Sequence, residues 1–175
     1  MHRLFVAIQP PDEVRELLLD LMEGADLRWQ QDEQLHLTLR FIGEVGRPVA
    51  NDIADALSRL KFPPFSLGLS GVGRFDHGRR GALWAGVEPR EEVRALSQKV
   101  ERACQGVGLE VERRTFHPHV TLARWNGRPS GLDRFIEMNA GLASVPWTVE
   151  EFILYESRLG RDGAHYEPVA AYSLG

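Results

Sequence analysis

Hydrophobic and polar residues alternate along this chain with two periods, one typical of strands and one typical of helices. Period-two alternation or short apolar runs predict strands over 3–9, 35–41, 65–73, 82–87, 109–113, 147–156 and 165–173, with one more strand that contains residues 119–122. Apolar residues three and four positions apart predict helices from Pro11 to Gly24 and over 48–60, 91–105 and 130–143. The predicted order therefore mixes strands and helices along the whole chain.

This order contains two similar β-α-β-α-β runs and no linker, so we expect one domain spanning residues 1–175. The fold class is predicted to be α+β, because sequential strands and tight turns favour antiparallel pairing. No glycine-rich turn of the kind that opens a doubly wound nucleotide fold is present. We predict two pseudo-symmetric lobes, each a mainly antiparallel sheet with helices on its outer face, and an active-site cleft between them.

One tetrapeptide occurs twice, almost half the chain apart, and each copy lies on a predicted strand. His36-Leu37-Thr38-Leu39 is repeated as His119-Val120-Thr121-Leu122. In a strand, side chains two positions apart share a face, so each copy presents a histidine and a threonine together. A single His-x-Thr is usually structural, but two copies at matched strand positions favour one shared site.

Two histidines facing one substrate suit acid–base chemistry, because histidine gains or loses a proton near neutral pH. Cleavage of a phosphoester uses such a pair, one as base toward water and one as acid toward the departing oxygen. The hydroxyls of Thr38 and Thr121 can hold phosphate oxygens. We therefore predict a catalytic pair, His36 and His119, with these threonines as phosphate ligands.

Two arginines follow the motifs and could stabilise negative charge on a phosphate. Arg40 has the same strand parity as His36, so we expect it to reach the cleft. Arg124 has the opposite parity to His119, so it needs a bulge or a twisted strand end to point inward. Both are candidate substrate-binding residues.

The composition of the chain limits the ligands and the cellular compartment that we expect. The chain has 175 residues, of which 43% are hydrophobic and 26% charged, with a formal net charge of −4. This excludes a broad basic surface for long nucleic acid but allows a local basic pocket. The single cysteine, Cys104, cannot form an internal disulfide, which favours a reducing, cytoplasmic setting. The apolar run near the start is too short to cross a membrane.

Other polar and aromatic residues have simpler interpretations. His117 and His119 resemble a metal pair, but no third ligand with suitable spacing stands out, so no metal is expected. The turn that contains Arg79 and Arg80 is solvated, or grips additional nucleotides if it lies at the mouth of the cleft. The tryptophans and phenylalanines are interpreted as core or cleft-wall residues, with base stacking as an alternative near the motifs.

The chain resembles the bacterial and archaeal RNA 2′,3′-cyclic phosphodiesterases, which belong to the 2H phosphoesterase superfamily and were first named 2′-5′ RNA ligases. The resemblance covers essentially the whole chain and lies in four stretches, residues 3–8, 36–44, 116–124 and 154–159. It implies a bilobal fold and metal-free opening of a terminal ribose 2′,3′-cyclic phosphate on RNA or a nucleotide to a 2′-phosphate.

The resemblance also implies separate roles for the two histidines. His36 would be the proton donor and His119 the proton acceptor, while Thr38, Thr121 and Arg124 would hold the phosphate. No cofactor, membrane or obligatory protein partner is expected, and the chain is expected to be a monomer. Two alternatives stay open at this point: joining of RNA ends through a 2′,5′ bond, and a module that binds RNA ends without turnover.

Overall fold

A computed structural model describes all 175 residues, Met1–Gly175, and its strands lie along one sheet path that runs from β7 to β9. The path has the order β7-β4-β5-β6-β3-β1-β8-β9, with β2 paired to β6, and all of its pairings are antiparallel. The strands are β1 His2–Ile8, β2 Arg28–Trp29, β3 Leu37–Val45, β4 Phe65–His77, β5 Arg80–Glu88, β6 His119–Asn126, β7 Trp147–Val149, β8 Glu151–Gly160 and β9 Gly163–Ser173. The predicted α+β class is confirmed.

Four α-helices match the four predicted from periodicity. They are α1 Asp12–Leu21, α2 Arg47–Ser58, α3 Glu91–Gly106 and α4 Leu132–Met138. The helix predicted over 130–143 is shorter in the structure. It begins only at Leu132, because Gly131 has a φ of 82°, which is outside the helical region, and it ends at Met138. The short strand β2 and the 3₁₀ turn η1, Asp32–Gln34, were not predicted, since neither is long enough to show a period.

The strand predicted over 109–113 is absent. The backbone groups of this segment bond to side chains instead: the carbonyl of Glu110 accepts from Arg40, and the amide of Glu112 donates to Glu101. These bonds satisfy polar groups that a neighbouring strand would otherwise have to satisfy. The prediction was wrong because alternation alone does not show which partner a segment finds.

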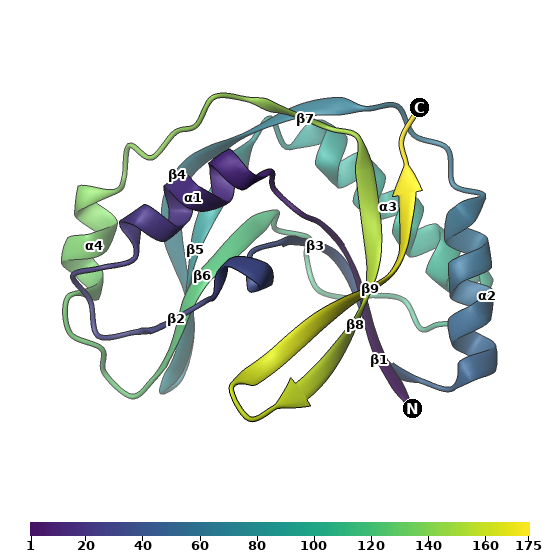
Figure 1. Cartoon of the computed structure of the whole chain (residues 1–175), viewed down its shortest axis with the longest axis horizontal. Coiled ribbons are helices and arrows are strands. Elements are labelled where there is room, and N and C mark those ends of the chain that lie inside the picture. Colours follow the sequence, from purple (N-terminus) through teal and green to yellow (C-terminus); the bar gives the residue numbers. More distant parts are fainter.

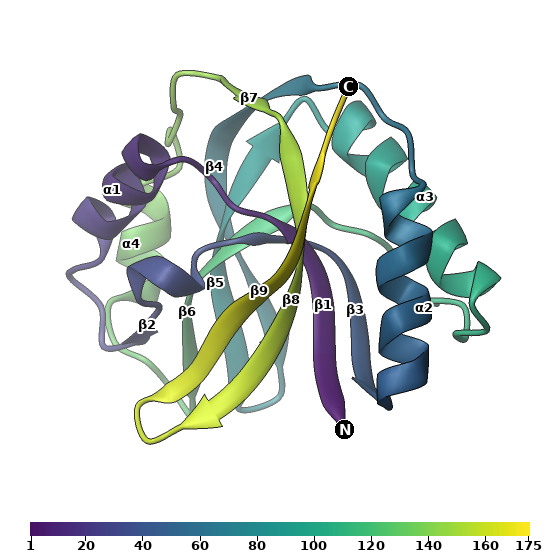
Figure 2. The ribbon, with the colours of Figure 1, turned by 45° about the vertical axis from the view of Figure 1, so that its right-hand side comes forward.

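The helices form two groups on opposite sides of the molecule (Figures 1 and 2). α2 and α3 lie beside the half made of β1, β3, β8 and β9, and α1 and α4 lie beside the half made of β4, β5 and β6. α1 follows β1 in the chain but lies beside the half that contains β4, β5 and β6. α3 follows β5 but lies beside the half that contains β1 and β3. Each predicted lobe is therefore assembled from segments far apart in the sequence.

The main core lies between the helices and one face of the sheet, and a smaller apolar cluster lies on the opposite face. In β1 the alternate residues Leu4, Val6 and Ile8 join the main core, while Phe5 and Ala7 join the smaller cluster. Burial on both faces explains why this strand reads as an unbroken apolar run. None of the helices has the length and apolar character to cross a bilayer.

Candidate active site

The two repeated motifs meet at a single pair of residues in the middle of the sheet. Leu37 of β3 and Val120 of β6 are the one antiparallel pair between these strands, and both side chains are buried in the main core. The residues on either side of this pair therefore point to the opposite face. The sheet surface that carries His36, Thr38, His119 and Thr121 is called the histidine face below.

Both histidine rings are held in the same way by the residue two positions earlier. Nδ1 of His36 lies 2.7 Å from the carbonyl oxygen of Gln34, and Nδ1 of His119 lies 2.6 Å from that of His117. A carbonyl oxygen only accepts, so each Nδ1 carries the proton and donates. Each Nε2 is left as the nitrogen that can take up or release a proton.

Aromatic side chains wall both rings. His36 lies against Phe5, with ring centroids 4.9 Å apart, and meets the edge of Tyr166 at 5.1 Å. His119 meets the ring of Phe75 edge-on at 5.0 Å. These apolar walls remove water from the imidazoles and disfavour their charged forms.

The charged form of each histidine is disfavoured by burial and by positive neighbours. Burial, followed by the charges of His119 and Arg124, lowers the pKa of His36 to about 4. Burial is also the main reason for the lowered pKa of His119, and Arg124 contributes again. Both rings are therefore neutral at pH 7 in the free protein, and a bound anion would favour their protonation.

The low pKa of His36 makes stability depend on pH. Histidine in an unfolded chain titrates near about 6.5, so between that value and the folded pKa of about 4 the unfolded state binds more protons. Stability therefore falls as the pH is lowered through this range. Between about pH 7.5 and about pH 5 we expect His36 to account for a loss of about 1 kcal/mol, allowing for its partly exposed ring.

Urea unfolding of the wild type and the His36→Asn variant at both pH values measures this contribution. Asparagine keeps an N–H donor for the Gln34 carbonyl but does not titrate. The variant should lose less stability than the wild type on acidification. Equal losses would show that His36 titrates alike in the folded and unfolded chains.

A bulge brings Arg124 to the histidine face, as its parity required. In the pairing of β5 with β6, Trp84 lies opposite Thr121 and Leu83 opposite Ala123, so the register shifts at Leu122. The additional residue reverses the alternation. Arg124 is exposed on the same face as His119, and of the two possibilities predicted for it, a bulge or a twisted strand end, the structure shows the bulge.

A second bulge, in β3, turns Arg40 away from the site, so the prediction that Arg40 reaches the cleft was wrong. The register of β3 against β1 shifts at Leu39, and Arg40 then points to the helix side. Its Nε donates to Glu101 of α3 at 2.9 Å, and Nη2 donates to the carbonyl of Glu110 at 2.6 Å. The side chain of Arg40 is 8% exposed, and its guanidinium links β3 to α3 and to the 109–113 segment rather than facing substrate.

The two bulges make Phe41 the counterpart of Arg124. Each lies five positions after its histidine, on the histidine face, and Phe41 is 51% exposed. The guanidinium of Arg114 lies 5.9 Å from the centre of the Phe41 ring. The two strands therefore keep the same geometry up to the fifth residue after the histidine, although the residue types there differ. Comparing Phe41 with Arg124, the fifth residues, instead of comparing Arg40 with Arg124, would have revealed this equivalence.

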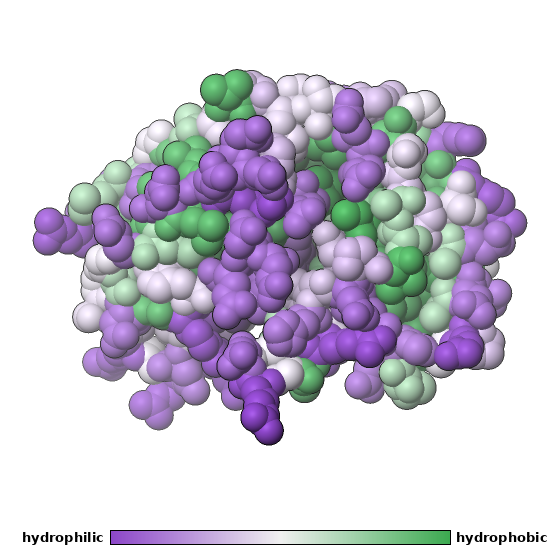
Figure 3. Space-filling view, viewed as in Figure 1, coloured by the Kyte–Doolittle hydropathy of each residue, from purple (hydrophilic) through white to green (hydrophobic).

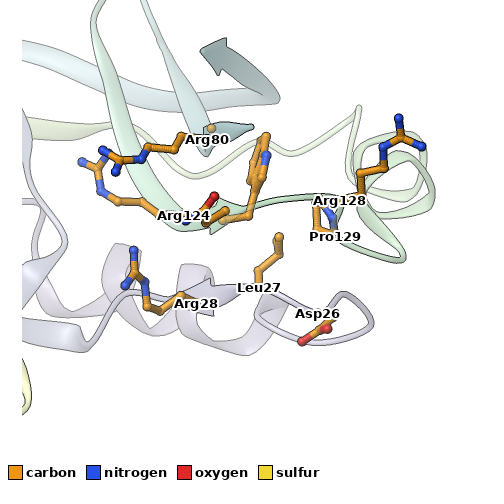
Figure 4. A pocket seen from close by; sticks show the side chains of 10 residues that line it. Asp26, Leu27, Arg28, Arg80, Arg124, Arg128 and Pro129 are labelled. Carbon is orange, nitrogen blue, oxygen red and sulfur yellow. The ribbon is translucent and has the colours of Figure 1, made fainter. Parts of the chain in front are cut away.

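Sequence reasoning missed the arginine-lined opening beside the motifs, although it offered the turn with Arg79 and Arg80 as a possible contact for additional nucleotides. Arg28 of β2 lies directly opposite Arg124, and Arg80 of β5 lies opposite Asn126, two residues beyond Arg124. Figure 4 shows the side chains of Arg28, Arg80 and Arg124 at the same end of this opening. β2 is too short to predict, so no sequence signal connected Arg28 with the motifs.

The structure brings five of the six predicted site residues to one face: His36, Thr38, His119, Thr121 and Arg124. Neither threonine hydroxyl has a hydrogen-bond partner within the protein. In Figure 3, hydrophilic residues crowd over the region where β2 and the tip of the β8–β9 hairpin lie in Figure 1. The arrangement offers two proton carriers, two free hydroxyls and one cation to a single anion.

Two curated proteins that share one name are similar in sequence to this chain. The curated RNA 2′,3′-cyclic phosphodiesterase of Aeropyrum pernix is 42% identical over 59% of this chain and 60% of that relative. The curated protein of the same name from Geobacillus stearothermophilus is 34% identical over 83% of this chain. That alignment covers 47% of the Geobacillus protein, so this chain matches about half of its length.

A solved structure covers the fold from end to end. The crystal structure of E. coli LigT complexed with 3′-AMP superposes with a TM-score of 0.81 at 28% identity, over 99% of this chain and 98% of that chain. The family model of the 2′-5′ RNA ligase superfamily matches residues 4–161, a range that contains both motifs and all six predicted site residues. The chain belongs to the 2′-5′ RNA ligase superfamily.

Proposed function

We propose that this chain is an RNA 2′,3′-cyclic phosphodiesterase, which hydrolyses a terminal ribose 2′,3′-cyclic phosphate on RNA or nucleotides to a 2′-phosphate. The observation that carries the proposal is the single Leu37–Val120 pair, which sets two His-x-Thr motifs side by side on one face. The curated relatives named for this activity support it.

The proposed reaction is an in-line displacement at phosphorus. His119 accepts a proton from the attacking water at its free Nε2 while the water oxygen bonds to phosphorus. The bond from phosphorus to the ribose 3′ oxygen breaks, and His36 donates its Nε2 proton to that oxygen. The resemblance to the family supports this assignment of donor and acceptor, and the proton and the leaving oxygen are both accounted for.

The substrate's own charge supplies the protonation state that the donor needs. The pKa of His36 is lowered first by burial and then by electrostatic repulsion from His119, when that ring is protonated, and from Arg124. An anionic phosphate bound between these groups offsets their repulsion and favours protonated His36. Thr38, Thr121 and Arg124 then stabilise the charge that develops on the phosphate oxygens.

Product identity tests the proposal. Purified protein is incubated, with a chelator present, with adenosine 2′,3′-cyclic phosphate and with an RNA that ends in a 2′,3′-cyclic phosphate. We expect a 2′-phosphate in both cases, identified by its chromatographic separation from the 3′ isomer. A 3′-phosphate, or loss of turnover with the chelator that added metal restores, would refute the reaction as written.

Joining of two RNA ends, the reaction for which the superfamily is named, is a second reaction that the same residues could perform. If the 5′-hydroxyl of another RNA replaces water as the attacking group, the product is a 2′,5′-linked RNA. Adding an RNA with a free 5′-hydroxyl to the assay compares joined with hydrolysed product. Tight binding of the RNA end with no product of either kind would instead support a binding module.

A further inference from the structure

Three arginines beside the motifs have no partner in the protein. Arg28, Arg80 and Arg124 are exposed, form no ion pair and donate no side-chain hydrogen bond to another residue. Arg74 on β4 is, by contrast, paired with Asp76 and Asp133. The unpaired guanidinium groups of Arg28, Arg80 and Arg124 are available to an anionic ligand.

The three side chains share the histidine face. Arg28 and Arg124 are directly opposite each other on β2 and β6, so they point to the same side. Arg80 has the parity of Ala82, which lies opposite Arg124. Like charges opposite each other destabilise a strand pair, and a bound anion would remove that cost.

The opening that these residues line is large enough for more than a phosphate. Its volume is about 860 Å³, and Arg124 connects it to the two histidines. The one carboxylate that lines it, Asp26, lies at the far end with Arg128, away from the three arginines (Figure 4). The far end of the opening therefore carries charges of both signs, whereas the end nearest the active site carries only positive charge.

We propose that Arg28 and Arg80, with Arg124 between them, bind a second phosphate of the substrate: the internucleotide phosphate that precedes the cyclic-phosphate end of an RNA. This inference rests on the proposed function and names its substrate class as an RNA end of two or more nucleotides. The local cluster in a chain of net charge −4 fits one such phosphate rather than a long nucleic-acid track.

Matched substrates separate the contribution of the second phosphate from that of the second base. The four substrates are adenosine 2′,3′-cyclic phosphate, its 5′-phosphorylated form, the adenosine dinucleotide that ends in the cyclic phosphate, and that dinucleotide with a neutral methylphosphonate linkage. We expect wild-type kcat/KM to be about tenfold higher for the charged dinucleotide than for its neutral analogue, as for one charged hydrogen-bonded contact.

Charge-removing variants assign this preference to residues. Arg28→Gln and Arg80→Gln should each lower kcat/KM on the charged dinucleotide by about fivefold to tenfold. Both variants should change the rate on adenosine 2′,3′-cyclic phosphate by less than about twofold. Arg28→Lys and Arg80→Lys should recover part of the loss, because lysine keeps the charge but lacks the bidentate fork. Arg128→Gln removes the same charge from the far end of the opening and should leave the preference intact.

Each other outcome overturns the inference. Equal rates on the charged and neutral dinucleotides, or equal losses on all substrates in the variants, would show that no second phosphate is bound here. A 5′-phosphorylated cyclic mononucleotide carries its phosphate on the same 5′ oxygen and should gain most of the advantage, so a rate no higher than that of the unphosphorylated mononucleotide would overturn the phosphate contact. If the wild type hydrolyses none of the four substrates, the proposed function itself fails, which is a different result from loss of the preference alone.

Discussion

Replacing His36 or His119 with asparagine is expected to lower kcat by about 10²- to 10⁴-fold while the protein stays folded. Asparagine can still donate to the carbonyl of Gln34 or His117, which each Nδ1 contacts in the wild type. It has no nitrogen that exchanges a proton near neutral pH. The variants therefore remove proton transfer and keep the local hydrogen bond, and steady-state kinetics on a cyclic nucleotide measures the effect.

The double variant tests whether the two histidines act in one step. Groups that work together are not additive, so removing both should cost little more than removing the more important one. His77→Asn is the matched control, because His77 is exposed in the β4–β5 hairpin and has no role in the proposed chemistry. A single variant of His36 or His119 that retains the wild-type rate would exclude that residue from proton transfer.

Replacing Arg40 with methionine is expected to destabilise the protein by about 3 kcal/mol without removing activity. The change removes the cation that neutralises the carboxylate of Glu101, which keeps only the amide of Glu112, and it leaves the carbonyl of Glu110 without its side-chain donor. Breaking one member of a largely buried ion pair is costly, because the remaining charge stays desolvated. Urea unfolding measures the stability, and kcat/KM under conditions where the variant is folded measures the activity.

A double-mutant cycle with Glu101→Gln separates the ion pair from the other bonds of Arg40. The coupling should be large, since the two groups lie 2.9 Å apart and share the 109–113 segment through the amide of Glu112. A variant with normal stability and strongly reduced turnover would restore Arg40 to phosphate binding, against its position in the structure.

Local patterns predicted much of the fold. Periodicity located all four helices and most of the strands, because the buried face of an amphipathic element requires apolar residues at regular spacing. The same argument placed His36 with Thr38 and His119 with Thr121. It failed over 109–113, where side chains of Arg40 and Glu101 satisfy the backbone. Periodicity also could not show that α1 packs with the half of the sheet that contains β4, because that depends on chain crossing.

The strand bulges explain why the arginines were harder to predict. A one-residue bulge reverses the face of every later residue, and no residue type marks its position in either motif. Leu39 and Leu122 follow equivalent threonines, and both strands bulge there. The prediction for Arg40 assumes uninterrupted alternation, whereas the parity of Arg124 already indicates a bulge or a twisted strand end.

The sequence by itself determined the α+β class, the two His-x-Thr strands and the histidine pair, since these depend on residue type and on neighbours close in the chain. Only the tertiary structure decided that Leu37 pairs with Val120, that Arg40 belongs to the core and that Arg28 and Arg80 join Arg124. The physical reason is that strand register, bulges and contacts between distant segments are settled by packing of the whole chain.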